Sequence, residues 1–447
     1  MRLTSQDYAE ARLESSLAQE HHYSRLIRNQ KFAVIPSFTL ESGETLSNCQ
    51  IAYKTWGKLN DKRDNVLVVC HALTGSSDLV DWWHPLFGPG KTLDPTRFFI
   101  FCGNCLGSPY GSSSSLNINP ATSKPYGADF PATTARDDVN AQKLVLDALG
   151  VSSVAAVVGG SMGGMTALEW GLCTPPHYVK TLVTIATSLS HSAWGIAWAE
   201  TQRQCIQNDS LFRGGHYEPH PSSQPASGLA AARMIAMLTY RSSTSFEARF
   251  GRKPNKTVTK KSKQSNHSHS SVSNVAVNSS NSDSHKRKLH PHFSVQGYLG
   301  YQGSKFLSRF DANCYLHLLN KMDSHDICRG RATNSNGAEC PTEDDFESVL
   351  SAVEPGALVV GVESDILFTP EEQRQLANAL PDARLHMLSS TNGHDGFLLD
   401  FEDLDRLMIE HLQNKHPQIY EGEPLVAGNA DLHIDANGAS MVGEMEE

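Results

Sequence analysis

The sequence lacks a long hydrophobic run, a secretory leader and a framework of paired cysteines. No stretch is long and apolar enough to predict a membrane-spanning helix. The first ten residues contain no apolar core and carry acids early, unlike a signal or transit peptide. The 9 cysteines are odd in number and show no paired spacing, which suits a reducing compartment. Together these absences predict a cytoplasmic protein.

A surplus of basic charge is also missing. The formal net charge of −10 disfavours binding to nucleic acid, because an acidic surface repels phosphate groups. Cys102-Gly-Asn-Cys105 has the spacing of a redox pair but not the thioredoxin-like setting, so buried free thiols are favoured. No pair of histidines has ligand spacing on an ordered element, and no metal is expected. A hydrophobic content of 39% still supports a sizeable core.

Apolar runs alternate with helical patterns in two parts of the chain. Fully apolar runs such as 65–70 and 154–158 are typical of strands buried on both faces of a parallel sheet. Residues 137–149 carry apolar side chains at helical spacing. The alternation stops after about residue 187 and resumes at 357. This order predicts an α/β protein with a doubly wound, mostly parallel sheet that is interrupted by an insertion.

The insertion shows helical patterns over 193–207, 228–240 and 304–320, with few strand runs. Because ligands of open α/β sheets bind at the carboxyl ends of the strands, we expect it to form a helical lid there. Residues 252–290 are rich in Ser, Asn, Lys and His and predict a disordered loop, although their lysine clusters could also serve as a nuclear signal. The expected parts are a flexible N-terminal segment, the first part of the core, the lid, the second part of the core and an acidic flexible tail: 1–30, 31–186, 187–352, 353–416 and 417–447.

The stretch Gly159-Gly-Ser161-Met-Gly163 follows an apolar run and precedes a plausible buried helix. A strand, a tight turn that holds a serine, and a helix are the setting of a G-x-S-x-G nucleophile elbow. There the serine lies at a helix start, where free N–H groups favour negative charge. The pattern alone is weak, because a plain glycine turn has the same sequence. A catalytic role therefore requires a histidine and an acid beside the serine.

Two residues further along the chain can supply them. Asp365 follows the apolar run 357–362, and His394 lies in the loop after the last predicted strand, 383–388. Serine, acid and histidine occur in the order found in α/β hydrolases, and both loops belong to the sheet edge expected for Ser161. Either residue alone could be a loop cap or a turn residue. In combination they predict a Ser161–His394–Asp365 triad.

Several motifs along the chain resemble one family. They are His71-Ala-Leu-Thr-Gly75, Pro131-Ala-Thr-Thr-Ala-Arg-Asp-Asp138, Met162-Gly-Gly-Met165, Phe310-Asp-Ala-Asn313 and Gly393-His-Asp-Gly-Phe397. Together they resemble the homoserine O-acetyltransferases, acyltransferases of methionine biosynthesis with the α/β-hydrolase fold. The similarity covers about residues 32–415 apart from 252–290. It is closest to the fungal type, in which the lid also carries a long polar insertion.

The resemblance implies a ping-pong reaction with acetyl-CoA as co-substrate and no further cofactor. Ser161 would attack the thioester, His394 would move the proton, and Asp365 would orient the imidazole. The backbone N–H groups of Leu73 and Met162 would form the oxyanion hole. No Gly-rich phosphate loop marks a site for CoA.

The resemblance also implies two substrate contacts. The Arg233 guanidinium would bind the carboxylate of the amino acid, and Asp395 would bind its ammonium group. From spacing alone, Arg233 would instead be a solvated helix residue. In relatives the lid also forms a homodimer contact.

Three alternatives stay open at the level of sequence. The acceptor could be L-serine or the donor succinyl-CoA, since one methylene is worth only about 1–3 kcal/mol of discrimination. The same triad would make an esterase if water reached the acyl-enzyme. A non-catalytic binding protein would need a broken triad, whereas this triad is complete.

Overall fold

The computed structural model describes residues 10–14, 16, 21–255, 293–332 and 341–426. Nine strands form one sheet in the order β1-β2-β3-β5-β4-β8-β9-β10-β11, and β6 pairs with β7 in a separate ribbon. The strands are β1 (Arg12–Glu14), β2 (Lys31–Thr39), β3 (Thr45–Trp56), β4 (Val66–Cys70), β5 (Phe99–Gly103), β6 (Ile118–Asn119), β7 (Lys124–Pro125), β8 (Val154–Gly160), β9 (Leu182–Ile185), β10 (Leu358–Val362) and β11 (Arg384–Leu388).

The large sheet is mixed. Strands β5, β4, β8, β9, β10 and β11 run parallel, whereas β1, β2 and β3 join at one end in antiparallel pairing. All five residues of β4 are buried, as expected for a strand covered on both faces. The predicted mostly parallel sheet is confirmed. Its six parallel strands end at one edge, so the loops that follow them lie near one another.

Helices cover both faces of the sheet and form the insertion. They are α1 (Leu79–Trp83), α2 (Ala135–Ala148), α3 (Met162–Cys173), α4 (Ala193–Gln207), α5 (Ala226–Tyr240), α6 (Ser243–Arg249), α8 (Ser294–Leu307), α9 (Ala312–Asp323), α10 (Glu343–Leu350), α11 (Pro370–Ala379), α12 (Gly396–Leu399), α13 (Phe401–Lys415) and α14 (Pro417–Glu421). The predicted helix at 137–149 corresponds to α2. No helix among these described residues is long and apolar enough to cross a membrane.

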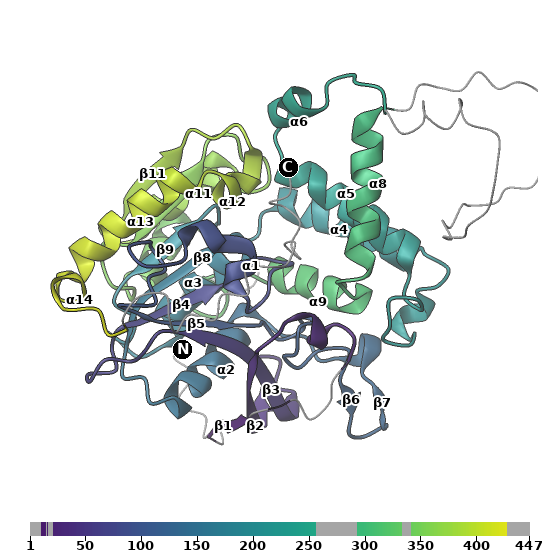
Figure 1. Cartoon of the computed structure of the whole chain (residues 1–447). Helices are drawn as coiled ribbons and strands as arrows, with labels where there is room; N and C mark the ends of the chain where they lie inside the picture. Colours follow the sequence, from purple (N-terminus) through teal and green to yellow (C-terminus); the bar gives the residue numbers. More distant parts are fainter. Residues whose placement is uncertain (1–9, 15, 17–20, 256–292, 333–340, 427–447) are drawn as a thin grey trace, which may run out of the picture.

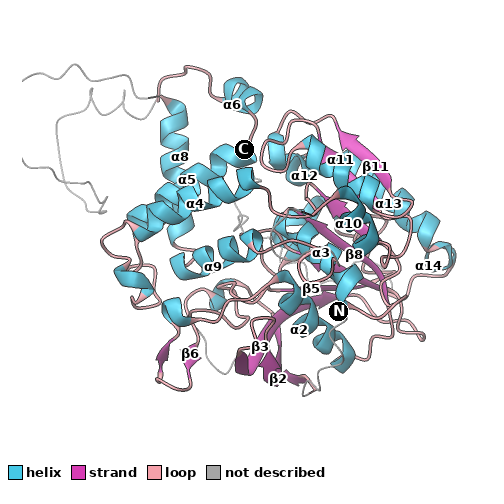
Figure 2. Cartoon of the chain, turned by 180° about the vertical axis from the view of Figure 1, so that it is seen from behind, coloured by secondary structure: helices cyan, strands magenta, loops and turns pink. Residues whose placement is uncertain are grey.

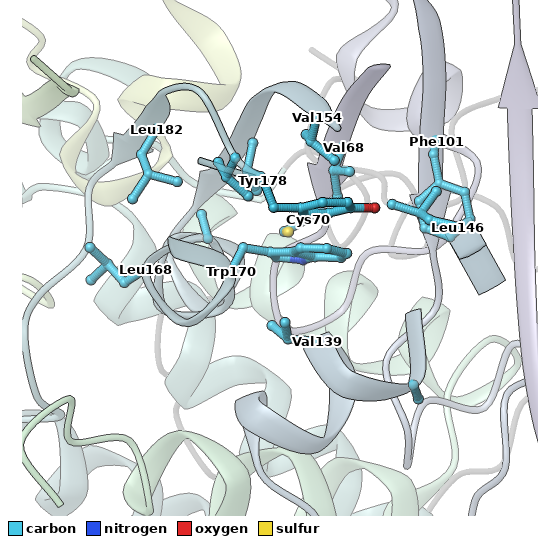
Figure 3. Packing of buried hydrophobic residues seen from close by; sticks show 14 of the residues in the cluster. Val68, Cys70, Phe101, Val139, Leu146, Val154, Leu168, Trp170, Tyr178 and Leu182 are labelled. Carbon is cyan, nitrogen blue, oxygen red and sulfur yellow. The ribbon is translucent and has the colours of Figure 1, made fainter. Parts of the chain in front are cut away.

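Each face of the sheet has its own core. On one face, side chains of β4 and β8 pack with α2, α3, α10 and α11; on the other, they pack with α1 and α13. In the first core Trp170 of α3 and Tyr178 lie close to Cys70 at the end of β4, with Val139 of α2 beside them (Figure 3). Alternate residues of a strand point to opposite faces, so one short strand contributes to both cores.

The insertion between β9 and β10 contains α4, α5, α6, α8 and α9, which we call the lid. Helices α4, α5, α8 and α9 gather on one side of the sheet domain in both views (Figures 1 and 2). They enclose a third buried cluster that includes Phe306, Phe310 and Tyr315. The lid therefore has an apolar core of its own, which also reaches Leu73 and Met162 at the edge of the sheet.

The predicted lid helices are confirmed over 193–207 and 228–240. The single helix predicted over 304–320 is wrong, because α8 ends at Leu307 and α9 begins at Ala312. Asp311 caps α9 by accepting a hydrogen bond from the Cys314 N–H at 3.1 Å. A capping aspartate stabilises a new helix start, which the apolar spacing did not reveal.

Parts of both predicted flexible ends belong to the described residues and are packed. Tyr23 is fully buried although it lies within the predicted N-terminal segment. At the other end, α14 follows α13 directly, and Arg97 donates hydrogen bonds to the carbonyls of Ile419, Tyr420 and Gly422. The buried ring of Tyr23 anchors the N-terminal segment, and the hydrogen bonds of Arg97 anchor residues 419–422. The polar composition of these two segments did not indicate such contacts. Of the predicted loop 252–290, residues 256–290 lie outside the described residues, as do 427–447.

Candidate active site

Ser161 sits at a sharp turn between β8 and α3. Its backbone has φ 58° and ψ −127°, a region that residues with a side chain seldom adopt. A Cβ at Gly163 would lie 2.1 Å from the carbonyl oxygen of Cys70. Only glycine therefore lets α3 approach the end of β4 so closely. The strained turn places Ser161 at the carboxyl edge of the sheet.

His394 and Asp365 meet in the loops after β11 and β10. The Nδ1–H of His394 donates a hydrogen bond of 2.7 Å to Oδ2 of Asp365, and both side chains are almost fully buried. The other oxygen of Asp365 accepts hydrogen bonds from the backbone N–H groups of Leu367 at 2.8 Å and Phe368 at 3.0 Å. Gln373 also donates to Oδ2 at 3.3 Å. These four donors fix the carboxylate in one orientation toward the imidazole.

One pocket brings the serine and the histidine together. It is lined by Ala72, Leu73, Thr74, Gly75, Trp82, Ser161, Tyr240, His394, Asp395, Phe397 and Leu398. The ring of Phe368 lies 5.3 Å and that of Phe397 5.4 Å from the imidazole. Apolar rings around a histidine limit access of water and strengthen electrostatic interactions there.

The two predicted oxyanion donors lie beside this pocket. Met162 is the first residue of α3, where a backbone N–H has no partner earlier in the helix. Leu73 follows β4 and lines the pocket directly. Leu73 shares the pocket with Ser161 and Met162 follows Ser161 in the chain, so both stay candidates for the oxyanion hole.

Asp395 lies next to His394 and lines the same pocket. Its Oδ2 is 2.8 Å from Nε of Arg241, which follows α5 in the lid. The lid chain lies tightly against this loop, since a Cβ at Gly393 would be 2.5 Å from the backbone nitrogen of Ser242. The Ser242 hydroxyl also donates to the carbonyl of Thr391. Residues 240–242 therefore connect the lid to the loop that carries His394.

Arg233 lies in α5 and is only 1% exposed. The alternative of a solvated helix arginine is therefore wrong. Its guanidinium lies 5.5 Å from the ring centre of Tyr240 and 5.0 Å from that of Phe306. Tyr240 lines the pocket and its ring lies 6.1 Å from that of His394. The ring of Tyr240 therefore lies between the buried Arg233 guanidinium and the His394 imidazole.

Sequence reasoning overlooked Tyr240 and Arg241. Tyr240 ends the predicted helix 228–240 and Arg241 follows it, and their proximity to His394 depends on how the lid packs. The sequence signal that could have drawn attention to them was a Tyr-Arg pair at the end of a lid helix that already contained Arg233. Such a pair is common on protein surfaces and is informative only with the fold in hand.

Cys102 and Cys105 are both buried free thiols. Burial raises the pKa of each thiol above its ordinary value, which disfavours the thiolate that redox chemistry needs. Within the described ranges, no group of three or more His, Cys, Asp or Glu side chains is placed to hold a metal ion.

The arrangement is suited to nucleophilic acyl transfer. A serine at a strained turn, a histidine oriented by a buried carboxylate and two backbone donors are the parts that such chemistry requires. Asp395 lines the same pocket, and its ion pair with Arg241 ties it to the lid.

Residues 65–401 match the family model described as alpha/beta hydrolase fold. The chain is 45% identical to the homoserine O-acetyltransferase of Cryptococcus neoformans var. grubii, over 95% of this chain and 96% of that protein. It is 42% identical to the homoserine O-acetyltransferase of Saccharomyces cerevisiae, over 95% of this chain and 94% of that protein.

Two groups of solved structures have a similar fold. The homoserine O-acetyltransferase of Bacillus anthracis superposes with a TM-score of 0.70 at 23% identity, covering 86% of this chain and 97% of that one. The esterase E22 superposes with a TM-score of 0.68 at 24% identity, covering 86% and 99%. Since an acyltransferase and an esterase fit equally well, the fold alone does not distinguish the two activities.

Proposed function

Since the chain belongs to the α/β-hydrolase fold family and, within it, to the homoserine O-acetyltransferases, we propose that Ser161, His394 and Asp365 transfer the acetyl group of acetyl-CoA to L-homoserine. The observation that carries this proposal is the bond between His394 and the buried Asp365, in the pocket that Ser161 also lines. The products are O-acetyl-L-homoserine and CoA, in the biosynthesis of methionine.

In the first half-reaction, Oγ of Ser161 attacks the thioester carbonyl while His394 takes its proton. The N–H groups of Leu73 and Met162 bind the oxygen that becomes negative in the tetrahedral intermediate. The carbon–sulfur bond then breaks, and His394 gives the proton to the departing CoA sulfur. Asp365 stabilises the imidazolium between these two transfers.

In the second half-reaction, His394 takes the proton of the homoserine hydroxyl group. The hydroxyl oxygen attacks the acetyl-serine carbonyl, a second tetrahedral intermediate forms in the same oxyanion hole, and the bond to Ser161 breaks. His394 returns the proton to Oγ of Ser161. The cycle leaves the enzyme unchanged and requires no group other than the two substrates.

The acceptor carries a carboxylate and an ammonium group. Asp395 lines the pocket, and the buried Arg233 guanidinium lies 5.5 Å from the ring centre of Tyr240, which lines it too. Asp395 is the proposed partner of the ammonium group, and Arg233 that of the carboxylate. Arg241 holds Asp395 in the free enzyme, as its 2.8 Å ion pair indicates. One oxygen of Asp395 can keep this pair while the other accepts from the substrate, because a carboxylate offers two oxygens.

The test is the release of CoA from acetyl-CoA with L-homoserine, with L-serine or with no acceptor. We expect release that depends on homoserine and disappears in Ser161→Ala. Faster release of CoA with L-serine than with L-homoserine would make L-serine the acceptor and leave the mechanism unchanged. Steady release without an acceptor would mean that water reaches the acyl-enzyme, and the protein would then be an esterase.

Succinyl-CoA is tested as donor in the same assay, and faster release from it than from acetyl-CoA would change the assigned donor. A homodimer through the lid and a cytoplasmic location stay predictions, as do the division at residues 186 and 353 and the flexible tail.

A further inference from the structure

We propose that His71 is a positioning residue of the oxyanion hole, because its imidazole fixes the peptide plane that joins Ala72 to Leu73. The inference deepens the proposed function and rests on its acyl-serine chemistry. It assigns a role to the first residue of the loop after β4.

The geometry begins with the carbonyl oxygen of Ala72. This oxygen accepts a hydrogen bond from Nδ1 of His71 at 2.8 Å and from the backbone N–H of Gly75 at 2.9 Å. The same peptide unit carries the N–H of Leu73. A trans peptide is planar, so its C=O and N–H groups point in opposite directions. Two donors that hold the carbonyl oxygen therefore also set the direction of the Leu73 N–H.

The second nitrogen of His71 fixes the ring itself. Its Nε2 accepts a hydrogen bond from the backbone N–H of Cys105 at 3.1 Å. The two bonds together require the neutral imidazole with its proton on Nδ1, because a carbonyl only accepts and a backbone N–H only donates. Burial, with the nearby Lys321 cation, lowers the pKa of His71 to about 4. The imidazole therefore keeps this single tautomer at neutral pH.

The loop that holds Nε2 is itself fastened to the lid. The backbone N–H of Leu106 donates to Asp138 at 2.7 Å, and Lys321 of α9 donates to the carbonyl of Leu106 at 2.8 Å. Lys321 also pairs with Asp138. A chain of bonds thus runs from a lid helix through the loop after β5 and His71 to the peptide of the oxyanion donor. The bond that the Ala72 carbonyl accepts from Nδ1 also polarises the Leu73 N–H, because both groups belong to one peptide unit.

The test compares His71→Leu with His71→Asn. Leucine fills the space without a donor, whereas the asparagine amide nitrogen stands the same number of bonds from the backbone as Nδ1 and can still donate to Ala72. For His71→Leu we expect the single-turnover acylation rate to fall about 10- to 100-fold. This fall should not exceed the fall in rate that removal of an oxyanion donor causes. The Kd for acetyl-CoA should stay unchanged, because the ground-state carbonyl does not depend on this donor. His71→Asn should recover most of the rate.

His416→Asn is the matched control. His416 is another buried histidine, whose Nε2 lies 2.8 Å from the carbonyl oxygen of Ala155, and it does not line the pocket. Its substitution should change thermal stability without changing the acylation rate. If His71→Leu does not fold, His71→Asn and the imidazole ¹⁵N spectrum of the wild-type protein still test the inference, since the spectrum must show a proton on Nδ1.

Acylation is measured with p-nitrophenyl acetate as well as acetyl-CoA. A Ser161-dependent burst of nitrophenol reports the oxyanion hole even if the acceptor or the thioester donor has been assigned wrongly. Wild-type acylation by folded His71→Leu, equal losses in the Leu and Asn variants at equal stability, or a proton on Nε2 would overturn the role of His71. Normal bursts without transfer to homoserine would instead overturn the proposed function alone.

Discussion

The core side and the lid side of the pocket hold their carboxylates in different ways. Asp365 is bound by His394, two backbone N–H groups and Gln373, all from the second part of the core. Asp395 pairs with Arg241, a long side chain that comes from the lid. Backbone donors cannot move without moving the fold, whereas a charged side chain can exchange partners. We therefore propose that the core side of the pocket serves the chemistry and the lid side the recognition of the substrate.

Asp365→Asn should have the largest effect on activity, and it distinguishes the core side of the pocket from the lid side most clearly. The amide cannot hold the imidazole in the required tautomer, so kcat should fall by about 10⁴-fold. Steady-state kinetics with both substrates measure this fall. Asp405→Asn is the matched control, since this buried carboxylate also accepts from backbone and side chain but belongs to α13. A loss of only a few-fold in Asp365→Asn would show that His394 is oriented by something else.

Asp395→Asn should act on binding instead. Loss of a charged hydrogen bond of about 1.5–3 kcal/mol should raise KM for L-homoserine roughly 10- to 100-fold while kcat and KM for acetyl-CoA change little. Arg241→Gln removes the same ion pair but keeps the carboxylate, so KM for homoserine should stay near wild type. If Asp395→Asn changed KM for L-homoserine and KM for acetyl-CoA equally, Asp395 would not be a specific contact of the amino acid.

The junction of lid and core should weaken in acid. His317 of α9 lies in this junction, with Nε2 at 2.7 Å from the Thr133 hydroxyl oxygen, and burial lowers its pKa to about 3. As the pH falls from 6.5 toward 3, the unfolded chain binds a proton at this histidine that the folded protein does not. Stability that is fully present above pH 6.5 is therefore lost, by up to about 1.4 kcal/mol per pH unit.

Urea unfolding at several pH values measures this loss in the wild type and in His317→Asn. The difference in free energy of unfolding between the two should shrink as the pH falls, because the variant has no proton to bind there. A constant difference between wild type and His317→Asn would contradict the prediction.

The smallest effect is expected from the insertion within the lid. Residues 254 and 293 form a bridge, and the Ser294 N–H donates to the carbonyl of Lys253 at 2.9 Å. A short turn can therefore replace 256–292 without moving the ends. Both kinetic constants and the melting temperature should stay near wild type, because loop length has only a weak effect on stability. Lost activity in folded protein would assign the insertion a part in the reaction.

Much of the core side follows from local sequence. The apolar run before Ser161, the glycines around it and the order of serine, acid and histidine predict the turn and its neighbours. Thr369 and Glu372 have the spacing of a capping box, and the Thr369 hydroxyl accepts from the Glu372 N–H at the start of α11. Such features depend on residues a few positions apart, so periodicity and capping rules are sufficient to find them.

The contacts on the lid side of the pocket became visible only in the tertiary structure. Apolar spacing identified α5 but not that Arg233 is buried under Tyr240 and Phe306, nor that Arg241 reaches Asp395. The hydrogen bonds that fix His71 likewise join loops far apart in the chain. Sequence by itself determined most strands and the elbow, because each is encoded by neighbouring residues, and the order of serine, acid and histidine along the chain indicated the candidate triad. Only the packed fold decided which distant charges, rings and peptide groups meet, because burial and pairing depend on partners that no local pattern names.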